Sequence, residues 1–227
     1  MMIERYEPIF CTALGKQQAL SLNVLIGALI VCFFIVIPTK TFPVQQEDWE
    51  LSIEKEGVTV HTRTTLNSLI KEFKATTSIS ADFEKVRDVI LDYPNYPLWY
   101  ENYKSGEIIQ RGENGELFVH FIINAPFPVK DRDSVNRVVI RDSAHRISIT
   151  LTSEPNIMKR RRGLIRMTQS SGHWLLTKKE FETEVTLVYH ADPKIPIPAW
   201  VANRYVVDGP ANSLLNLKRL AEKQNQF

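Results

Sequence analysis

The chain of 227 residues has a net charge of +2, with 44% hydrophobic and 24% charged residues. Values this close to those of ordinary globular proteins exclude collagen-like, low-complexity and wholly disordered chains. Two cysteines cannot frame a disulfide-stapled protein of this length, and the small positive charge gives no electrostatic reason to expect nucleic acid as a partner.

The first element in chain order is an uncharged apolar segment at residues 19–38, which reads ALSLNVLIGALIVCFFIVIP. About twenty helical residues span about 30 Å, the thickness of the hydrocarbon core of a bilayer. A buried core helix would carry an apolar stripe, whereas this segment is apolar on every side. The segment therefore predicts a membrane-spanning helix.

The same segment could instead belong to a cleaved signal peptide. Its apolar run is longer than the roughly 7–15 residues of a signal peptide, and no Ala-x-Ala motif follows Pro38, which favours an uncleaved anchor. Arg5 and Lys16 precede the run and Lys40 follows it, a weak asymmetry that places the N-terminus in the cytoplasm and the C-terminal domain on the non-cytoplasmic side. A cleaved leader with a secreted or periplasmic domain is the alternative.

From residue 45 onward the pattern is that of one α+β domain. Alternating apolar residues on both sides of Glu56-Gly57 predict a β-hairpin, and a further strand is expected over residues 72–79. Ser80 is positioned to cap a helix, which Pro94 then ends. The apolar stripe of that helix is Phe83, Val86 and Ile90.

A series of strand patterns follows without intervening helices. They cover residues 117–123, 135–139, 147–151, 164–169, 174–176 and 185–189. Within the first of them Leu117, Val119, Phe121 and Ile123 alternate along one face. Strands that succeed one another in this way predict an antiparallel sheet.

The chain closes with a long helical pattern. Pro198 suits a first helical turn, and apolar residues at spacings of three or four run from Ala202 to Ala221. Gly209-Pro210 is expected to kink or loosen this helix, because proline removes a backbone hydrogen bond. A curved sheet with only two substantial helices leaves a concavity with the geometry of a binding site.

Familiar catalytic motifs are absent from the sequence, which has no GxSxG, P-loop, HExxH or CxxC pattern. The five histidines fall on separate predicted strands or turns, and the acidic residues are scattered. We therefore expect no metal site, no cofactor and no catalytic residue.

One basic cluster stands out, formed by Lys159, Arg160, Arg161 and Arg162. It is either a solvated turn between strands or a surface that attracts anionic lipid head groups, each basic residue then contributing about 1 kcal/mol. A nucleic-acid site would need a larger cationic area with interleaved aromatic residues. A membrane surface is therefore the partner that this cluster favours.

Several short motifs occur in an order that resembles a known family. The strands at residues 49–63 (WEL, EGVTV, R) look like a first hairpin, and VILD followed by Trp99 looks like the helix and tryptophan that come next. PFPVKDRD at 126–133 is similar to a proline-rich turn with an Arg-Asp pair. SGHW, DP and IPAWVAN within 171–203 resemble the approach to a final helix. Together they resemble the START domain, the steroidogenic-acute-regulatory-protein-related lipid transfer family.

The resemblance implies a helix-grip fold, in which a curved antiparallel sheet wraps around the long C-terminal helix and encloses a lipid-sized cavity. Residues 1–44 would then be a leader with the membrane segment, and residues 45–227 the START-like domain. The expected function is membrane-tethered binding or transfer of a lipid, without enzymatic activity. A polyketide cyclase or aromatase of the same broad fold, and a ligand-sensing regulator, are the alternatives. His120, with strand parity opposite to Phe121, argues against a cyclase.

Strand parity and the resemblance together single out the residues expected at the ligand. The expected apolar lining is Trp99, Phe121, Ile123, Trp174, Tyr189, Val206 and Val207. The residues expected to orient a polar head group are Arg132, Asp133 and Arg166. Plain core packing is the alternative for the first set, and a structural Arg–Asp pair is the alternative for the second. The terminal helix and a neighbouring loop are expected to form the gate.

Overall fold

The computed structural model describes residues 48–66, 68–125, 127–192 and 199–223. The predicted membrane segment at 19–38 and Pro198 lie outside the described residues. Within the described part of the chain, no helix combines the length and the hydropathy that crossing a bilayer requires.

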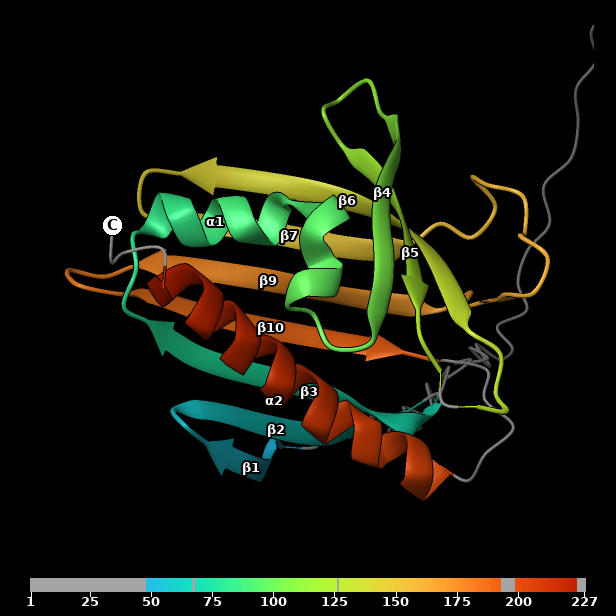
Figure 1. The fold of residues 1–227 in the computed structure, drawn as a ribbon, viewed down its shortest axis with the longest axis horizontal. Helices are drawn as coiled ribbons and strands as arrows, with labels where there is room; N and C mark the ends of the chain where they lie inside the picture. Colours follow the sequence, from blue (N-terminus) through green and yellow to red (C-terminus); the bar gives the residue numbers. More distant parts are fainter. Residues whose placement is uncertain (1–47, 67, 126, 193–198, 224–227) are drawn as a thin grey trace, which may run out of the picture. The chain divides into compact units, whose positions relative to one another are not determined.

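The described part of the chain contains a curved sheet of ten strands (Figure 1). The strands are β1 Glu50–Lys55, β2 Val58–Thr65, β3 Ser68–Ile79, β4 Tyr103–Arg111, β5 Leu117–Ile123, β6 Arg132–Ser143, β7 Arg146–Ser153, β8 Ile165–Arg166, β9 Ser170–Lys178 and β10 Thr183–Ala191. Their order is β1-β2-β3-β10-β9-β7-β6-β5-β4, with every neighbouring pair antiparallel, and the short β8 pairs in parallel with β6. The antiparallel sheet is confirmed, apart from β8.

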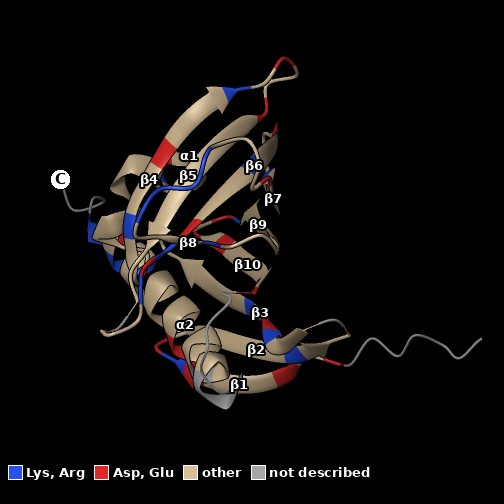
Figure 2. Ribbon diagram, turned by 90° about the vertical axis from the view of Figure 1, so that its right-hand side faces the viewer, with Lys and Arg blue, Asp and Glu red and all other residues tan. Residues whose placement is uncertain are grey.

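Three helical segments accompany the sheet: α1 at Phe83–Leu91, the 3-10 helix η1 at Tyr93–Leu98 and α2 at Ala199–Lys223. All three lie over one face of the sheet, and α2 packs mainly on β3 and β2 (Figure 1). Helix α2 continues through Gly209-Pro210 without a break. The curvature of the sheet around these helices is visible in end view (Figure 2). This arrangement matches the helix-grip fold.

The local signals of the first hairpin are confirmed. Glu56 and Gly57 connect β1 to β2 with positive φ angles of 49° and 77°, values that favour glycine at the second position. The capping prediction at Ser80 was wrong. Asp82 directly precedes α1, and the backbone N–H of Ser80 instead donates to Glu222 of α2 at 3.1 Å.

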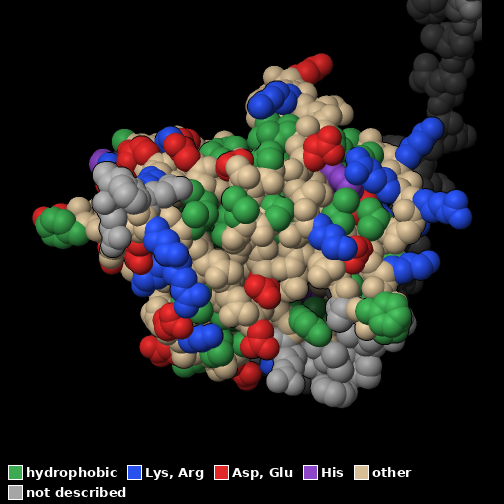
Figure 3. Space-filling view, in the orientation of Figure 1, with side chains coloured by type: hydrophobic (Ala, Val, Ile, Leu, Met, Phe, Trp, Pro, Cys, Tyr) green, Lys and Arg blue, Asp and Glu red, His purple; other side chains and the backbone are tan. Residues whose placement is uncertain are grey.

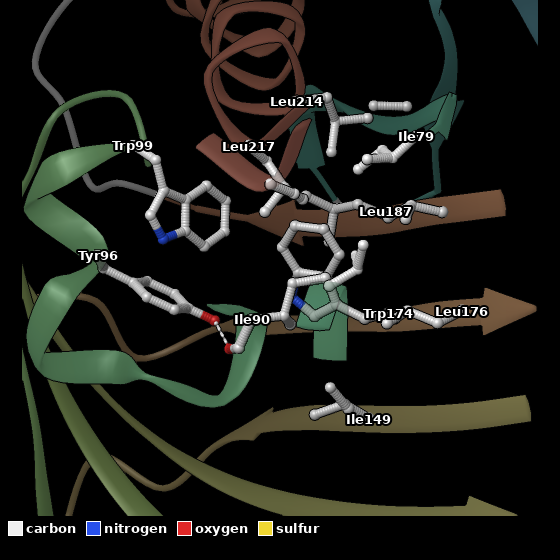
Figure 4. Close-up of a cluster of buried hydrophobic side chains, with 14 of the residues drawn as sticks. Ile79, Ile90, Tyr96, Trp99, Ile149, Trp174, Leu176, Leu187, Leu214 and Leu217 are labelled. Carbon is white, nitrogen blue, oxygen red and sulfur yellow. Dashed lines mark hydrogen bonds between the residues drawn. The ribbon is translucent and has the colours of Figure 1, made fainter. Parts of the chain in front are cut away.

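One end of the concave side is a packed core (Figure 4). The rings of Trp99 and Trp174 meet edge to face, with their centroids 6.1 Å apart. Leu214 of α2 is fully buried there, and the hydroxyl of Tyr96 donates to the carbonyl of Ile90 at 2.7 Å. Buried side chains from the sheet, η1 and α2 pack densely against one another and fill this end of the concave side.

Strand β4 was not predicted from the sequence. Its register shifts twice against β5, and its residues YKSGEIIQR show no clean alternation. Gly106 lets η1 lie directly on β4, because a Cβ atom at that position would stand 2.4 Å from the carbonyl oxygen of Tyr93. The strand therefore depends on a close tertiary contact more than on its own pattern.

Candidate functional site

A cavity of about 250 Å³ lies at the other end of the concave side, between the N-terminal half of α2 and the sheet. Its lining is mainly apolar and combines residues from β3, β10, α2 and the segments that flank β4, β5 and β6. The lining residues are Ile70, Lys71, Phe73, Tyr100, Glu101, Asn102, Tyr103, Ile123, Asn124, Ala125, Val129, Arg132, Met167, Tyr189, Ala191, Ala202, Tyr205, Val206, Gly209 and Pro210. An apolar pocket with a few polar groups is the usual form of a small-molecule site.

Tyrosine side chains form much of one wall. The rings of Tyr100 and Tyr103 lie 4.3 Å apart between their centroids, and that of Tyr189 lies 6.3 Å from Phe73. Burial raises the pKa of Tyr100 and of Tyr103 above the usual value of a phenol. These hydroxyls therefore stay neutral at physiological pH and can donate or accept hydrogen bonds.

A polar cluster supports Tyr189 from the sheet. Burial raises the pKa of Tyr189, although hydrogen bonds with Ser170 and Asn136 partly oppose that effect. Ser170 donates to Asn136 Oδ1 at 2.9 Å. Gly172 provides the space for the ring, because a Cβ atom there would stand 2.3 Å from Tyr189 Cδ2. The phenol is thus held in one orientation at the cavity wall.

Arg132 brings a guanidinium group to the same cavity. Its side chain is almost completely buried, and it donates a hydrogen bond to the carbonyl of Lys130. Burial lowers the pKa of Arg132, while the charge of the neighbouring Asp131 opposes that effect. Asp131 is itself paired with Lys104 at 2.5 Å. A planar cation in an apolar pocket suits a phosphate or carboxylate group of an amphiphilic ligand.

Asp133 and Arg166 lie on the opposite face of the sheet, because successive side chains of β6 alternate. Asp133 Oδ2 accepts from Arg166 Nη2 at 2.7 Å and lies 3.0 Å from His120 Nε2. Burial alone would raise the pKa of Asp133, but hydrogen bonds from Arg166 and His120 outweigh it and the pKa is lowered. Arg166 also donates to the carbonyls of Pro155 and Met158, so this ion pair holds the segment between β7 and β8.

The structure therefore divides the predicted site residues. The predicted residues that line the cavity are Ile123, Arg132, Tyr189 and Val206. Those in the packed core are Trp99, Phe121 and Trp174. Val207 lies on α2 outside the lining, and the Asp133–Arg166 pair has the geometry of the structural alternative.

The basic cluster lies in the segment between β7 and β8, where Lys159, Arg160, Arg161 and Arg162 are all exposed (Figure 2). Arg161 stands 3.6 Å from Glu107 of β4, a surface contact of small energetic value. Within the described residues, no group of His, Cys, Asp or Glu side chains is arranged to hold a metal ion.

Sequence reasoning missed Tyr100 and Tyr103. The available signal was the density of aromatic residues at 93–103, which is unusual for a connection between a helix and a strand. Ser170 and Asn136 were missed because they are small polar residues on strands that were identified by their apolar neighbours.

A curved antiparallel sheet that closes on a C-terminal helix over an apolar cavity defines a ligand-enclosing helix-grip domain. The family model described as the START domain matches residues 39–224, and the chain belongs to this family.

Individual relatives agree with this assignment. An uncharacterised protein of Pseudomonas aeruginosa is 31% identical over 180 residues, covering 78% of this chain and 89% of the relative. The human phosphatidylcholine transfer protein is 25% identical over 184 residues, covering 77% of this chain and 84% of the relative. A crystal structure of a STAR-related lipid transfer protein fragment from Xanthomonas axonopodis superposes with a TM-score of 0.70 at 26% identity, covering 77% of this chain and 99% of that one.

Proposed function

We propose that this chain binds a lipid in the cavity under α2 and transfers it between membranes. The observation that carries the proposal is the position of Arg132, a buried cation on the wall of an otherwise largely apolar cavity. The family membership and the names of the relatives, which include phosphatidylcholine transfer proteins and STAR-related lipid transfer proteins, support it.

The energetic need for such a cavity follows from the cost of exposing a lipid chain to water. Each exposed methylene costs about 0.8 kcal/mol, so a chain of about sixteen faces a barrier on the order of 13 kcal/mol. Enclosure by Phe73, Ile123 and Val206 would remove part of this cost. A cavity of 250 Å³ lies below the roughly 300–1,000 Å³ of drug-sized pockets, so a two-chain lipid requires α2 to move outward.

The polar groups favour a phospholipid as the ligand class. The guanidinium of Arg132 can donate hydrogen bonds to a phosphate. The hydroxyls of Tyr100 and Tyr103 can donate hydrogen bonds to the uncharged ester oxygens of the same lipid. A non-enzymatic role fits these residues, since His120 is held on the opposite face by Asp133. The cyclase alternative would need an acid–base pair at the ligand.

Membrane tethering through the apolar segment at 19–38 is part of the proposal, as is attraction of the exposed cluster at 159–162 to anionic lipid. The sequence of the segment and the exposure of the cluster support these two points. The side of the membrane on which the domain lies follows from the charges flanking the segment and is likewise proposed.

Native mass spectrometry of the full-length chain purified from cells tests the proposed function. We expect a co-purified phospholipid, and a lower retained amount after the substitution Arg132→Met. A chain that carries no lipid, and that also takes up none from phosphatidylcholine vesicles, would overturn the proposal. Turnover of the bound molecule in the same sample would establish an enzyme instead.

A further inference from the structure

The hairpin tip between β2 and β3 exposes two leucines beside the cavity. Leu66 is 80% exposed and Leu69 is 83% exposed, while the next residues, Ile70 and Lys71, line the cavity. The tip projects at the right-hand end of the sheet, where α2 begins (Figure 1). A single exposed leucine is common on a protein surface, but here two of them stand together at the rim of a proposed lipid site.

A third exposed apolar side chain projects from another segment of the same rim. Phe127, between β5 and β6, is 97% exposed, and Val129 two residues later lines the cavity. Apolar side chains emerge at this right-hand end of the domain in the space-filling view (Figure 3). Single side chains on separate tips are too small for a protein interface of about 800 Å² per partner. They suit insertion into the surface of a bilayer, with the exposed Lys130 at its head groups.

The same hairpin is joined to α2 by one side chain. Asn203 Oδ1 accepts a hydrogen bond from the backbone N–H of Lys71 at 2.8 Å, and Asn203 Nδ2 donates to the carbonyl of Leu69 at 3.2 Å. The pairing of β3 with β10 ends at Phe73, so the amide group of Asn203 takes the place of a strand neighbour. Between these two contacts, His190 holds the carbonyl of Ile70 from β10 at 3.2 Å.

The two halves of α2 are held very differently. In the C-terminal half, Ser213 Oγ accepts from the backbone N–H of Glu101 at 2.9 Å, and Asn216 donates to the carbonyl of Trp99 at 3.2 Å. In the N-terminal half, Tyr205 is half exposed and Asn203 supplies the polar contacts to the sheet described above. Pro210, at the junction, has no N–H to donate to the preceding turn.

We infer that the β2–β3 tip is a bilayer-operated trigger for the cavity. Insertion of Leu66 and Leu69 into a membrane surface draws the backbone of residues 69–71 away from Asn203, and the N-terminal half of α2 swings outward on Gly209-Pro210. The cavity then opens where a lipid can enter and stays closed in water. This inference rests on the proposed function and adds the signal that regulates it.

Hydrogen exchange at the amide of Lys71 reports the Asn203 contact directly. The full-length chain is held in amphipol and measured before and after addition of vesicles of phosphatidylcholine with an anionic phospholipid. In the unaltered chain we expect vesicles to accelerate this exchange roughly tenfold, the equivalent of losing about one ordinary hydrogen bond. In the variant Leu66→Ser/Leu69→Ser the vesicles should have no effect. In Asn203→Ala the exchange should be fast in both states.

Lipid transfer by the same variants separates the role of the two leucines from that of the Asn203 contact. Leu66→Ser/Leu69→Ser should slow transfer between vesicles at least tenfold, while Asn203→Ala added to that variant should restore much of the rate. The control is Phe181→Ser, which removes an equally exposed aromatic from the β9–β10 turn at the opposite end of the sheet and should change nothing (Figure 1). Circular dichroism and thermal unfolding establish that each variant is folded.

Loading with a fluorescent short-chain phospholipid, which is soluble without a bilayer, distinguishes this inference from the proposed function. Equal loading by the unaltered chain and the leucine variant supports the trigger. Loading by neither chain overturns the proposed function, and with it the inference. Normal vesicle transfer by the leucine variant, or failure of Asn203→Ala to restore it, overturns the trigger while leaving lipid binding intact.

Discussion

The two ends of the concave side are covered by the same helix and the same sheet, yet one is a packed core and the other a cavity. At the packed end Leu214 and Leu217 of α2 meet Trp174 with essentially no exposed surface. At the cavity end Val206 and Ile123 face an open volume of 250 Å³. The difference shows that a side chain on the concave face need not border the cavity, because much of that face is packed core.

The largest difference should come from shortening an α2 side chain at each end. Leu217→Ala should lower the free energy of unfolding by about 2–5 kcal/mol, because it leaves a void in a packed core. Val206→Ala should cost about 1 kcal/mol or less, since its side chain already borders a cavity. Urea unfolding followed by tryptophan fluorescence measures both. Equal losses would mean that the cavity end is packed as tightly as the core.

The sequence was sufficient for the local parts of this fold. The hairpin turn at Glu56-Gly57 and the helical spacing from Ala202 to Ala221 depend on neighbours in the chain, and both were predicted. Strand β4 depends on the contact of Gly106 with η1, which no local pattern contains.

The candidate site was harder to predict, for a related reason. Phe121 and Ile123 share one face of β5, but only Ile123 lies far enough along the strand to border the cavity. Their depth depends on where η1 and α2 rest, which is a tertiary fact. Arg132 and Asp133 are adjacent in sequence and therefore point to opposite faces of β6. Only Arg132 borders the cavity.

The next effect tests the charge at the cavity end. Arg132→Met should weaken binding of a fluorescent phospholipid about 10- to 100-fold, the value of charge-assisted hydrogen bonds lost in a buried site. The free energy of unfolding should change little, because the charge no longer has to be desolvated while its hydrogen bond to the carbonyl of Lys130 is lost. Arg132→Lys keeps the charge but lacks the planar guanidinium, so its affinity should lie between those of the unaltered chain and Arg132→Met. Unchanged affinity in Arg132→Met would remove Arg132 from the site.

A smaller effect concerns two glycines, Gly172 behind the ring of Tyr189 and Gly209 on α2. Gly172→Ala should destabilise the fold by about 1–3 kcal/mol and weaken lipid binding, because the new Cβ atom meets Tyr189 Cδ2 at 2.3 Å. Gly209→Ala should stabilise it by up to about 1 kcal/mol, since a Cβ atom there meets nothing within 4 Å and alanine favours a helix. Thermal unfolding and a lipid-binding titration measure the pair. Equal behaviour of the two variants would show that Tyr189 is not held by Gly172.

The last comparison concerns the pH dependence of the ion pair on the opposite face of the sheet. The pKa of Asp133 is lowered on folding, so its pairing with Arg166 contributes stability above the ordinary carboxyl pKa of about 4. That contribution should be lost as the pH falls through the lower pKa of the folded state. The stability difference between the unaltered chain and Asp133→Asn should therefore be constant above about pH 5 and shrink below pH 4.

Lipid affinity should not follow the titration of Asp133 while the fold persists, because Asp133 lies on the face of β6 opposite to the cavity. Unfolding and lipid binding measured over the same pH series compare the two faces directly. If lipid affinity fell together with the Asp133 contribution before unfolding began, the ion pair would act on the ligand through β6. Asp133 would then affect the ligand although it lies on the other face of the sheet from Arg132, which would support the head-group role predicted for it.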